Sequence, residues 1–284
     1  MIGELSVIKP GLHTSIQDLG RSGLLKYGVP SSGVLDRYAA KVANLLLRNN
    51  ADDAVLEITV MGPKLKFNHP TKIAISGANL SPKLNDKLVD NNKVHVVDTG
   101  DVLSFGQKKE GARSYLSVFG GFKTEGIFGS KSWYEGITSY GRLAKGSILN
   151  FETTTNDLVQ THSSIIYENM YLKNEQIEVF PGPEYHKLDR NQQLFIENQI
   201  FHIGKNNNRM AYQLEEVLLN NLEPIITGGV LPGTIQLTPS GKLIILMRDC
   251  QTTGGYPRIL QVSESSLCRL AQKFTTDKIR FIVK

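Results

Sequence analysis

The sequence predicts a mainly β protein with a few short helices, and three observations support this class. Many short segments alternate polar and apolar residues with a period of two, as half-buried strands do. The 284-residue chain contains 26 glycines, and turn-forming pairs separate the alternating segments. The segments are short and closely spaced, which favours antiparallel barrels or sandwiches over units in which strands alternate with helices.

The expected strands follow one another along the chain. The first spans residues 3–10, where Leu5 and Val7 alternate with Glu4 and Ser6. Further strands are expected at residues 64–67, 72–75, 93–97, 101–105, 115–119, 147–151, 177–180, 241–247 and 278–283. Turn signals such as Gly62-Pro63 lie between them.

Three helices are expected between the strands. Residues 36–48 place alanine, valine and leucine at helical spacing, and Asp36 supplies a carboxylate at the N-terminal end. Residues 263–274 carry one apolar stripe, with Ser263 as the N-cap. Residues 188–197 form a third, less regular candidate.

The chain length suits one large domain or two ordinary ones, and an internal echo favours two. The strand that runs into Pro10-Gly11 resembles the strand that runs into Pro181-Gly182, and the polar segment 152–164 between the two halves reads as a linker. We therefore expect two β domains of related design, at residues 1–165 and 166–284.

Composition excludes several classes of protein. The 32 basic and 27 acidic residues are scattered, so no basic stripe predicts a nucleic-acid partner. No apolar run approaches the roughly 20 residues that a membrane-spanning helix needs. Two cysteines make no disulfide framework, and the start of the chain shows no signal peptide, so we expect a cytoplasmic location.

Searches for familiar cofactor motifs find none. The chain has no Walker A loop, no G-x-G, no G-x-S-x-G elbow and no H-E-x-x-H. Its six histidines form no short-range ligand pair and it has no C-x-x-C, so no metal site is predicted. No methionine precedes a lysine, so we expect no covalently attached biotin. If ATP or biotin takes part in the function, it binds at a site without a familiar motif or is bound by a partner protein.

Three segments hold more polar and glycine residues than packing requires, and loops of this kind carry binding sites. The first, residues 14–37, contributes Gln17, Asp18, Arg21, Ser32 and Asp36. An irregular surface loop with a structural ion pair is the alternative. Because Asp18 and Arg21 lie three positions apart, they can instead bind the two ends of a zwitterionic or amide-bearing ligand.

The other two segments lie in the second half of the chain. Residues 208–215 contribute Arg209 and Tyr212, and surface ion pairs of Arg209 and Glu215 are an equally good explanation of this segment. Residues 228–257 contribute candidates around a glycine-rich turn: Gln236, Gln251, Thr252, Thr253 and Tyr256. Their neutral donors and acceptors suit an amide or a phosphate, and a plain hairpin turn is the alternative.

Two further side chains are possible nucleophiles or bases. Cys250 follows Asp249, and a neighbouring acid disfavours a thiolate, so a structural role is expected. His13 lies beside the first segment and is likewise more typical of a structural residue.

Together these segments resemble the carboxyltransferase A/B, or KipA-like, family over nearly the whole chain. The matching motifs are Thr14-Ser-Ile-Gln-Asp-Leu-Gly-Arg21, Gly28-Val-Pro-x-Ser-Gly33 with Asp36, Leu56-Glu-Ile-Thr59, Ile75-Ser-Gly-Ala78, Arg113-Ser-Tyr-Leu116 with Gly120-Gly121, Gly129-Ser130, Phe180-Pro-Gly-Pro-Glu184, Arg209-Met210, Gly233-Thr-Ile-Gln236 and Gln251-Thr-Thr-Gly-Gly-Tyr-Pro257. Three positions depart from the family pattern: Asn79, Ala211 and Cys250.

The resemblance implies two cyclophilin-like β-barrel domains and a partner, the KipI-like B subunit. The family includes the C subunit of the bacterial ATP-dependent 5-oxoprolinase, in which the B and C subunits phosphorylate 5-oxoproline and the A subunit opens the ring to glutamate. It also includes the carboxyltransferase part of urea carboxylase, long labelled allophanate hydrolase subunit 2. Both reactions act on an amide-like group that must be held and polarised.

The resemblance leads to a first hypothesis, that the chain is the C subunit of an ATP-dependent 5-oxoprolinase. This enzyme is a hydrolase that would be active only with its partner subunits, and whether Mg²⁺ accompanies the ATP is left open. Asp18 and Gln251 are the expected catalytic residues, and Arg21 is expected to bind a carboxylate or phosphate. The remaining Gln and Thr candidates would orient the lactam. The alternatives are a biotin-dependent carboxyltransferase component and a KipA-type module that sequesters a kinase inhibitor.

Overall fold

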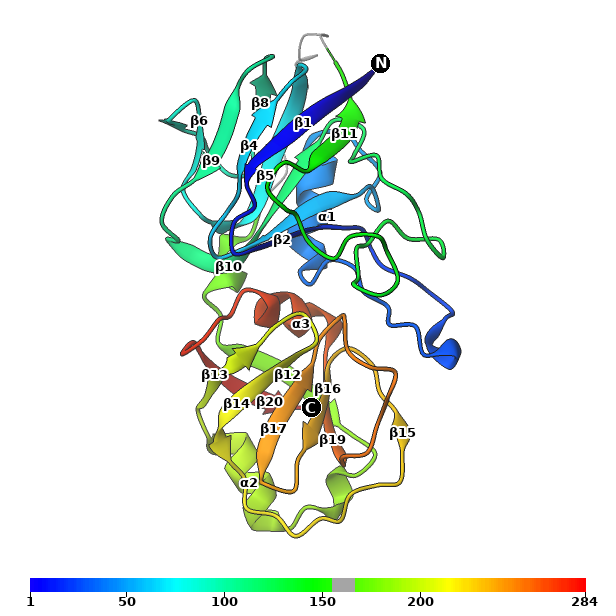
Figure 1. The fold of residues 1–284 in the computed structure, drawn as a ribbon. Coiled ribbons are helices and arrows are strands. Elements are labelled where there is room, and N and C mark those ends of the chain that lie inside the picture. Colours follow the sequence, from blue (N-terminus) through cyan, green and yellow to red (C-terminus); the bar gives the residue numbers. More distant parts are fainter. Residues whose placement is uncertain (155–166) are drawn as a thin grey trace. The chain divides into compact units, whose positions relative to one another are not determined.

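The computed structural model describes residues 1–154 and 167–284 (Figure 1). These residues form two units: Met1–Gly20 with Asp36–Lys173, and Arg21–Leu35 with Asn174–Lys284. The predicted boundary between residues 165 and 166 and most of the predicted linker lie outside the described residues. The segment Arg21–Leu35, which we call the strap, belongs to the second unit although it precedes most of the first in sequence.

The first unit consists of two sheets and one α-helix. The six-stranded sheet has the order β11 (Ile148–Glu152), β1 (Ile2–Lys9), β4 (Lys64–Phe67), β9 (Val102–Phe105), β6 (Pro82–Leu84), β7 (Lys87–Leu88). The five-stranded sheet has the order β2 (His13–Gln17), β3 (Val55–Thr59), β10 (Glu110–Val118), β5 (Thr71–Asn79), β8 (Val94–Val97). Apolar residues from both sheets, such as Leu5 and Leu116, form one buried cluster.

The second unit is built on a closed barrel of seven strands. Its order is β12 (Gln176–Pro181), β19 (Arg258–Val262), β16 (Thr234–Leu237), β17 (Lys242–Leu246), β14 (Ala211–Val217), β13 (Phe201–Asn207), β20 (Lys278–Val283). The strands pair antiparallel except where β12 and β20 close the barrel in parallel. A separate two-stranded ribbon joins β15 (Gly228–Gly229) and β18 (Thr253–Gly254).

All three predicted helices are present, and each begins at a residue whose side chain caps it. Asp36 accepts a hydrogen bond from the Ala39 N–H at the start of α1 (Arg37–Leu46), which packs against β5 and β10. Asp189 caps α2 (Arg190–Asn198), and Ser263 caps α3 (Glu264–Ala271). Single 3₁₀ turns occur at Leu25–Tyr27, Asn169–Leu172 and Tyr185–Lys187. The predicted class, a mainly β protein with a few short helices, is confirmed.

The two Pro-Gly positions of the sequence echo share a physical role. A Cβ on Gly11 would lie 2.5 Å from the Met61 carbonyl oxygen, and one on Gly182 would lie 2.2 Å from that of Arg258. At both places the backbone of another segment approaches so closely that only glycine fits. Each Pro-Gly therefore lies at the end of a strand, β1 or β12, where the backbone of another segment packs against it.

No helix in the described ranges 1–154 and 167–284 is long and apolar enough to cross a membrane.

Candidate functional site

The ribbon of the second unit presents several of the predicted site residues. Gly229 pairs with Thr253, and the Val230 N–H donates to the Thr252 carbonyl at 3.0 Å. The side chains of Gln251, Thr253 and Tyr256 are exposed, and Thr252 is half-buried. The backbone of the turn is thus fixed by the ribbon, while its neutral donors and acceptors stay open to solvent and available to a ligand.

Gln236 lies beneath this ribbon. It is buried in β16, and its Nε2 lies 3.4 Å from the Tyr256 carbonyl oxygen. A Cβ on Gly254 would lie 2.5 Å from the same Nε2. The glycine therefore makes room for the Gln236 amide, and this side chain supports the ribbon from below.

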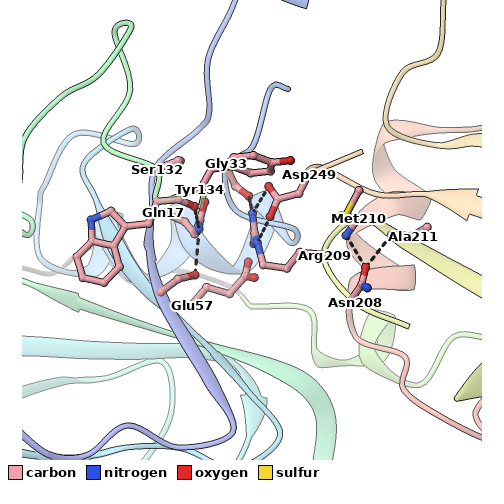
Figure 2. Close-up of polar contacts among 12 residues, drawn as sticks. Gln17, Gly33, Glu57, Ser132, Tyr134, Asn208, Arg209, Met210, Ala211 and Asp249 are labelled. Carbon is pink, nitrogen blue, oxygen red and sulfur yellow. Dashed lines mark hydrogen bonds and ion pairs between the residues drawn. The ribbon is translucent and has the colours of Figure 1, made fainter. Parts of the chain in front are cut away.

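The strap is fastened to the rest of the second unit by Arg209. This guanidinium makes two bonds to the Asp249 carboxylate, at 2.7 and 3.0 Å, and a third to the Gly33 carbonyl at 2.7 Å (Figure 2). Arg209 and Asp249 are both buried. Because Asp249 precedes the Gln251 turn, one side chain holds both the strap and the beginning of the turn. We call Arg209, Asp249 and Gly33 the clamp.

The other strap residues are also held by backbone contacts. The Arg21 N–H donates to the Ser31 carbonyl at 2.6 Å, and the Ser32 N–H donates to the Arg248 carbonyl at 3.0 Å. Arg21, Ser32 and Arg248 are all buried, and Leu35 belongs to the apolar core of the barrel. The glycine-rich strap is therefore a fixed part of the second unit.

Tyr212 and Cys250 are buried within the second unit. Tyr212 lies in β14 at zero exposure, and its hydroxyl donates to the Lys273 carbonyl at 3.3 Å. Burial and the charge of Asp249 raise the pKa of the Cys250 thiol to about 12. This thiol stays protonated near neutral pH, which supports the structural role expected from the sequence.

In the first unit, Gln17 and Asp18 organise the chain around residues 130–133. Gln17 is buried in β2 and donates to the Ser15 hydroxyl at 3.0 Å and to the Trp133 carbonyl at 3.1 Å (Figure 2). Asp18 accepts bonds from both Ser130 and Ser132 hydroxyls at 2.6 Å.

Two backbone N–H groups, of Gly20 at 2.8 Å and Lys131 at 2.5 Å, complete the set of Asp18 contacts. With four bonds on two oxygens, the Asp18 carboxylate already fixes a loop.

A cavity of about 190 Å³ adjoins Asp18. Asp52, Asp53 and Lys131 also line it, together with Ser130 and two glycines. Three carboxylates against one ammonium group give this cavity a negative field, which disfavours a carboxylate or a phosphate. The cavity is therefore a poor match for an anionic substrate or for the phosphates of a nucleotide.

Asp36 lies in a buried polar network of the first unit. Besides capping α1, its carboxylate accepts from the Tyr171 hydroxyl at 2.6 Å, and Tyr171 lies 3.0 Å from the hydroxyl of Tyr167. Burial, followed by the Asp36 charge, raises the pKa of Tyr171 far above its ordinary value. The rings of Tyr38, Tyr167 and Tyr171 pack on one another at centroid distances of 5.2–6.1 Å.

Three residues that were not among the predicted site residues extend this network. The Tyr115 hydroxyl accepts from the Asp36 N–H at 2.8 Å and donates to Glu57 at 2.9 Å. Glu57 forms a buried ion pair with Arg113, with 3.7 Å between Oε1 and Nε. The signal was present in the family motifs around Glu57 and Arg113, where charged residues interrupt otherwise apolar strands.

The structure thus groups the predicted residues within each unit. The second unit holds Arg21, Ser32, Arg209, Tyr212, Gln236, Gln251, Thr252, Thr253 and Tyr256. The first holds Gln17, Asp18 and Asp36. Within the described part of the chain, no group of three or more His, Cys, Asp or Glu residues is arranged to hold a metal ion. The assignment of these residues to a site stays a prediction.

The fold and these residues define a mainly β protein with a closed seven-stranded barrel and a solvent-exposed ribbon of neutral hydrogen-bonding groups. The family model of the carboxyltransferase domain, subdomain A and B, matches residues 27–283. The chain belongs to this family.

Three proteins illustrate what the chain is similar to. It is 34% identical to the C subunit of 5-oxoprolinase from Escherichia coli, over 98% of this chain and 90% of that protein. The crystal structure of TTHA0988 matches 99% of this chain and 55% of its own, with a TM-score of 0.87 and 25% identity. The urea carboxylase of Kluyveromyces lactis matches 99% of this chain but 27% of its own, with a TM-score of 0.83 and 28% identity.

Proposed function

We propose that this protein is the C subunit of an ATP-dependent 5-oxoprolinase. Together with a KipI-like B subunit it phosphorylates 5-oxoproline, and the A subunit opens the activated ring to glutamate. The observation that carries the proposal is the match to the C subunit of 5-oxoprolinase, which extends over nearly the full length of both chains. The urea carboxylase match covers only a quarter of a much longer protein.

The chemistry of the second unit supports a lactam substrate. Amide and hydroxyl groups of Gln251, Thr252 and Thr253 bind and orient a ring amide without titrating near neutral pH. The ribbon fixes their backbone, so little ordering is required when a ligand binds. ATP belongs to the proposal as the phosphoryl donor of the assembled enzyme, and we assign none of this chain's residues to it.

Reconstitution tests the proposed function. The chain is mixed with its A and B partner subunits, ATP, Mg²⁺ and 5-oxoproline, and glutamate and ADP are measured against a control that lacks this chain. We expect both products only in the complete mixture. Glutamate formation that does not exceed the two-subunit control would rule out the proposal. A tight complex without turnover would favour the KipA-type binding module.

A variant in the turn beside the ribbon tests the role of the side chains of that turn. We expect Gln251→Ala to abolish turnover while the far-ultraviolet circular dichroism spectrum and binding of the KipI-like partner stay unchanged. Gln107→Ala is the matched control, because Gln107 is also exposed but lies in the first unit. Loss of folding in Gln251→Ala would instead give this residue a structural role.

Family membership and the urea carboxylase match favour a second candidate, a biotin-dependent carboxyltransferase component. This function requires a biotinylated carrier on another chain. Streptavidin blotting of the proteins that co-purify with the chain distinguishes the two functions. A biotinylated partner, with carboxylation of urea by the complex, would replace the first proposal.

A further inference from the structure

Ser32 combines three unusual features in the strap. Its φ is 52°, its side chain is fully buried, and its hydroxyl has no hydrogen-bond partner among the described residues. Of the nine non-glycine residues with positive φ in the described part of the chain, it is the only one at zero exposure. Positive φ and an unpartnered buried hydroxyl both cost free energy, and such features gather where a ligand binds.

Arg248 adjoins Ser32 and carries a second unpartnered donor. Its carbonyl accepts from the Ser32 N–H at 3.0 Å, and its side chain is 6% exposed. One terminal nitrogen bonds to Glu264, whereas the buried Nε has no partner among the described residues. Two residues joined through their backbones therefore each hold a buried donor that no described residue satisfies.

The charges around Arg248 favour an anion. The carboxylate that it pairs with, Glu264, is 55% exposed, so solvent screens that charge. Asp249 is neutralised by the two bonds from Arg209. The Cys250 thiol has a pKa of about 12 and adds no negative charge at neutral pH. The positive charge of Arg248 is therefore only partly compensated within the second unit.

The strap holds Ser32 rigidly. Gly33, the next residue, is bonded to Arg209 at 2.7 Å, and Leu35 is buried in the barrel core. The Ser32 N–H is itself bonded to Arg248. A ligand that bonds to the Ser32 hydroxyl thus meets a group whose position is already fixed.

We propose that the Ser32 hydroxyl and the Arg248 Nε–H form an oxyanion subsite that binds the carboxylate of a small acid, with one carboxylate oxygen for each donor. Identifying the acid with 5-oxoproline rests on the proposed function. A phosphate oxygen shares the same chemistry, so the test compares both anions. Urea is neutral and would form only weaker bonds with these donors.

Direct binding to the intact chain tests the subsite without any turnover. Isothermal titration calorimetry measures three probes: 5-oxoproline, its neutral carboxamide and inorganic phosphate. We expect 5-oxoproline to bind at least about tenfold more tightly than the carboxamide, the size of effect that a charge-assisted bond gives. We expect phosphate to bind more weakly than 5-oxoproline.

Two variants remove one donor each with little change elsewhere. Ser32→Gly removes the hydroxyl and tolerates the positive φ, and Arg248→Lys keeps the charge beside Glu264 but lacks Nε. Each should weaken 5-oxoproline binding about tenfold and weaken carboxamide binding less, because a neutral carbonyl accepts a weaker bond than a carboxylate does. The exposed residues of the same unit serve as controls: Ser240→Gly and Arg280→Lys should bind as the wild type does.

Several results would overturn the subsite. These are no detectable binding of 5-oxoproline to the wild type, wild-type affinity in both variants, equal losses for the acid and the carboxamide, or phosphate binding more tightly than the acid. Circular dichroism establishes that each variant is folded before it is titrated. Binding as expected, with no glutamate formed on reconstitution, would refute the proposed function and leave the subsite intact.

Discussion

The clamp predicts a large loss of stability when Arg209 is replaced by methionine. The change removes two charge-assisted bonds to Asp249 and one to the Gly33 carbonyl, all at 2.7–3.0 Å. Asp249, 7% exposed, then keeps a buried carboxylate without its cation. Breaking a buried pair in this way costs about 3–5 kcal/mol. We expect Arg209→Met to destabilise the second unit by that amount.

Urea unfolding followed by two probes measures this loss. Far-ultraviolet circular dichroism reports both units, whereas fluorescence of the single tryptophan, Trp133, reports the first unit. The circular dichroism transition should move to lower urea while the Trp133 transition moves less. Arg190→Met is the matched control, because Arg190 forms an exposed ion pair with Glu197 and should lose under about 1 kcal/mol.

A double variant tests the physical reason for the loss. Arg209→Met with Asp249→Leu removes both charges, so no uncompensated carboxylate remains, and stability should exceed that of Arg209→Met alone. A loss below about 1 kcal/mol for the single variant would refute the clamp. A double variant that loses the full sum of the two single changes would show that the buried charge is not the cause.

Three further predictions follow from local geometry. Tyr171→Phe removes the 2.6 Å bond to the Asp36 carboxylate and should destabilise the first unit by about 1.5–3 kcal/mol in urea unfolding, with unchanged stability contradicting the network. Gly182→Ala places a Cβ 2.2 Å from a backbone carbonyl and should cost at least about 1–3 kcal/mol, whereas Gly229→Ala, with nothing within 4 Å, should cost less than half as much in the same assay. The pKa of the Cys250 thiol is raised from 9.0 to about 12, so this thiol should resist iodoacetamide at pH 8 in the folded protein and react after unfolding, as mass spectrometry would show. Because the folded-state pKa is the higher one, the contribution of the protonated thiol to stability is complete below pH 9 and is lost as the pH rises toward 12.

The three helices were predictable because their signals are local. Of the seven barrel strands only β12, β17 and β20 were expected, and β13, β14, β16 and β19 were missed. Spacing of apolar residues and the caps at Asp36 and Ser263 define α1 and α3 within a single stretch of sequence. The strand β2 was missed, since its residues read as a polar loop. In the structure it is buried along almost its whole length, and its Gln17 amide bonds to the carbonyl of Trp133, 116 positions away.

The same limit applies to the site. The sequence identified Asp249 only as a neighbour of Cys250. Its ion-pair partner, Arg209, lies 40 positions earlier in the chain, so no local pattern predicts the pair. The strap passes from the first half of the sequence into the second unit, where it bonds to Arg209 and Arg248. Contacts of this kind join residues that no local pattern connects, so a single sequence identifies the participants without showing how they pair.

A high number of polar side chains in a glycine-rich segment has two physical explanations: the side chains hold the fold, or they bind a ligand. The burial of each side chain and the hydrogen bonds it makes distinguish the two. Side chains that hold the fold are buried with their bonds made, as those of Asp36 and Arg209 are. Side chains that we propose to bind a ligand are either open to solvent, as Gln251 is, or buried with a donor that no described residue satisfies, as Ser32 is. If the clamp only stabilises, a conservative Asp249→Glu change should lower stability without altering the affinity for 5-oxoproline. If it also positions Ser32, the affinity for 5-oxoproline should fall, and the affinity for the neutral carboxamide should fall less.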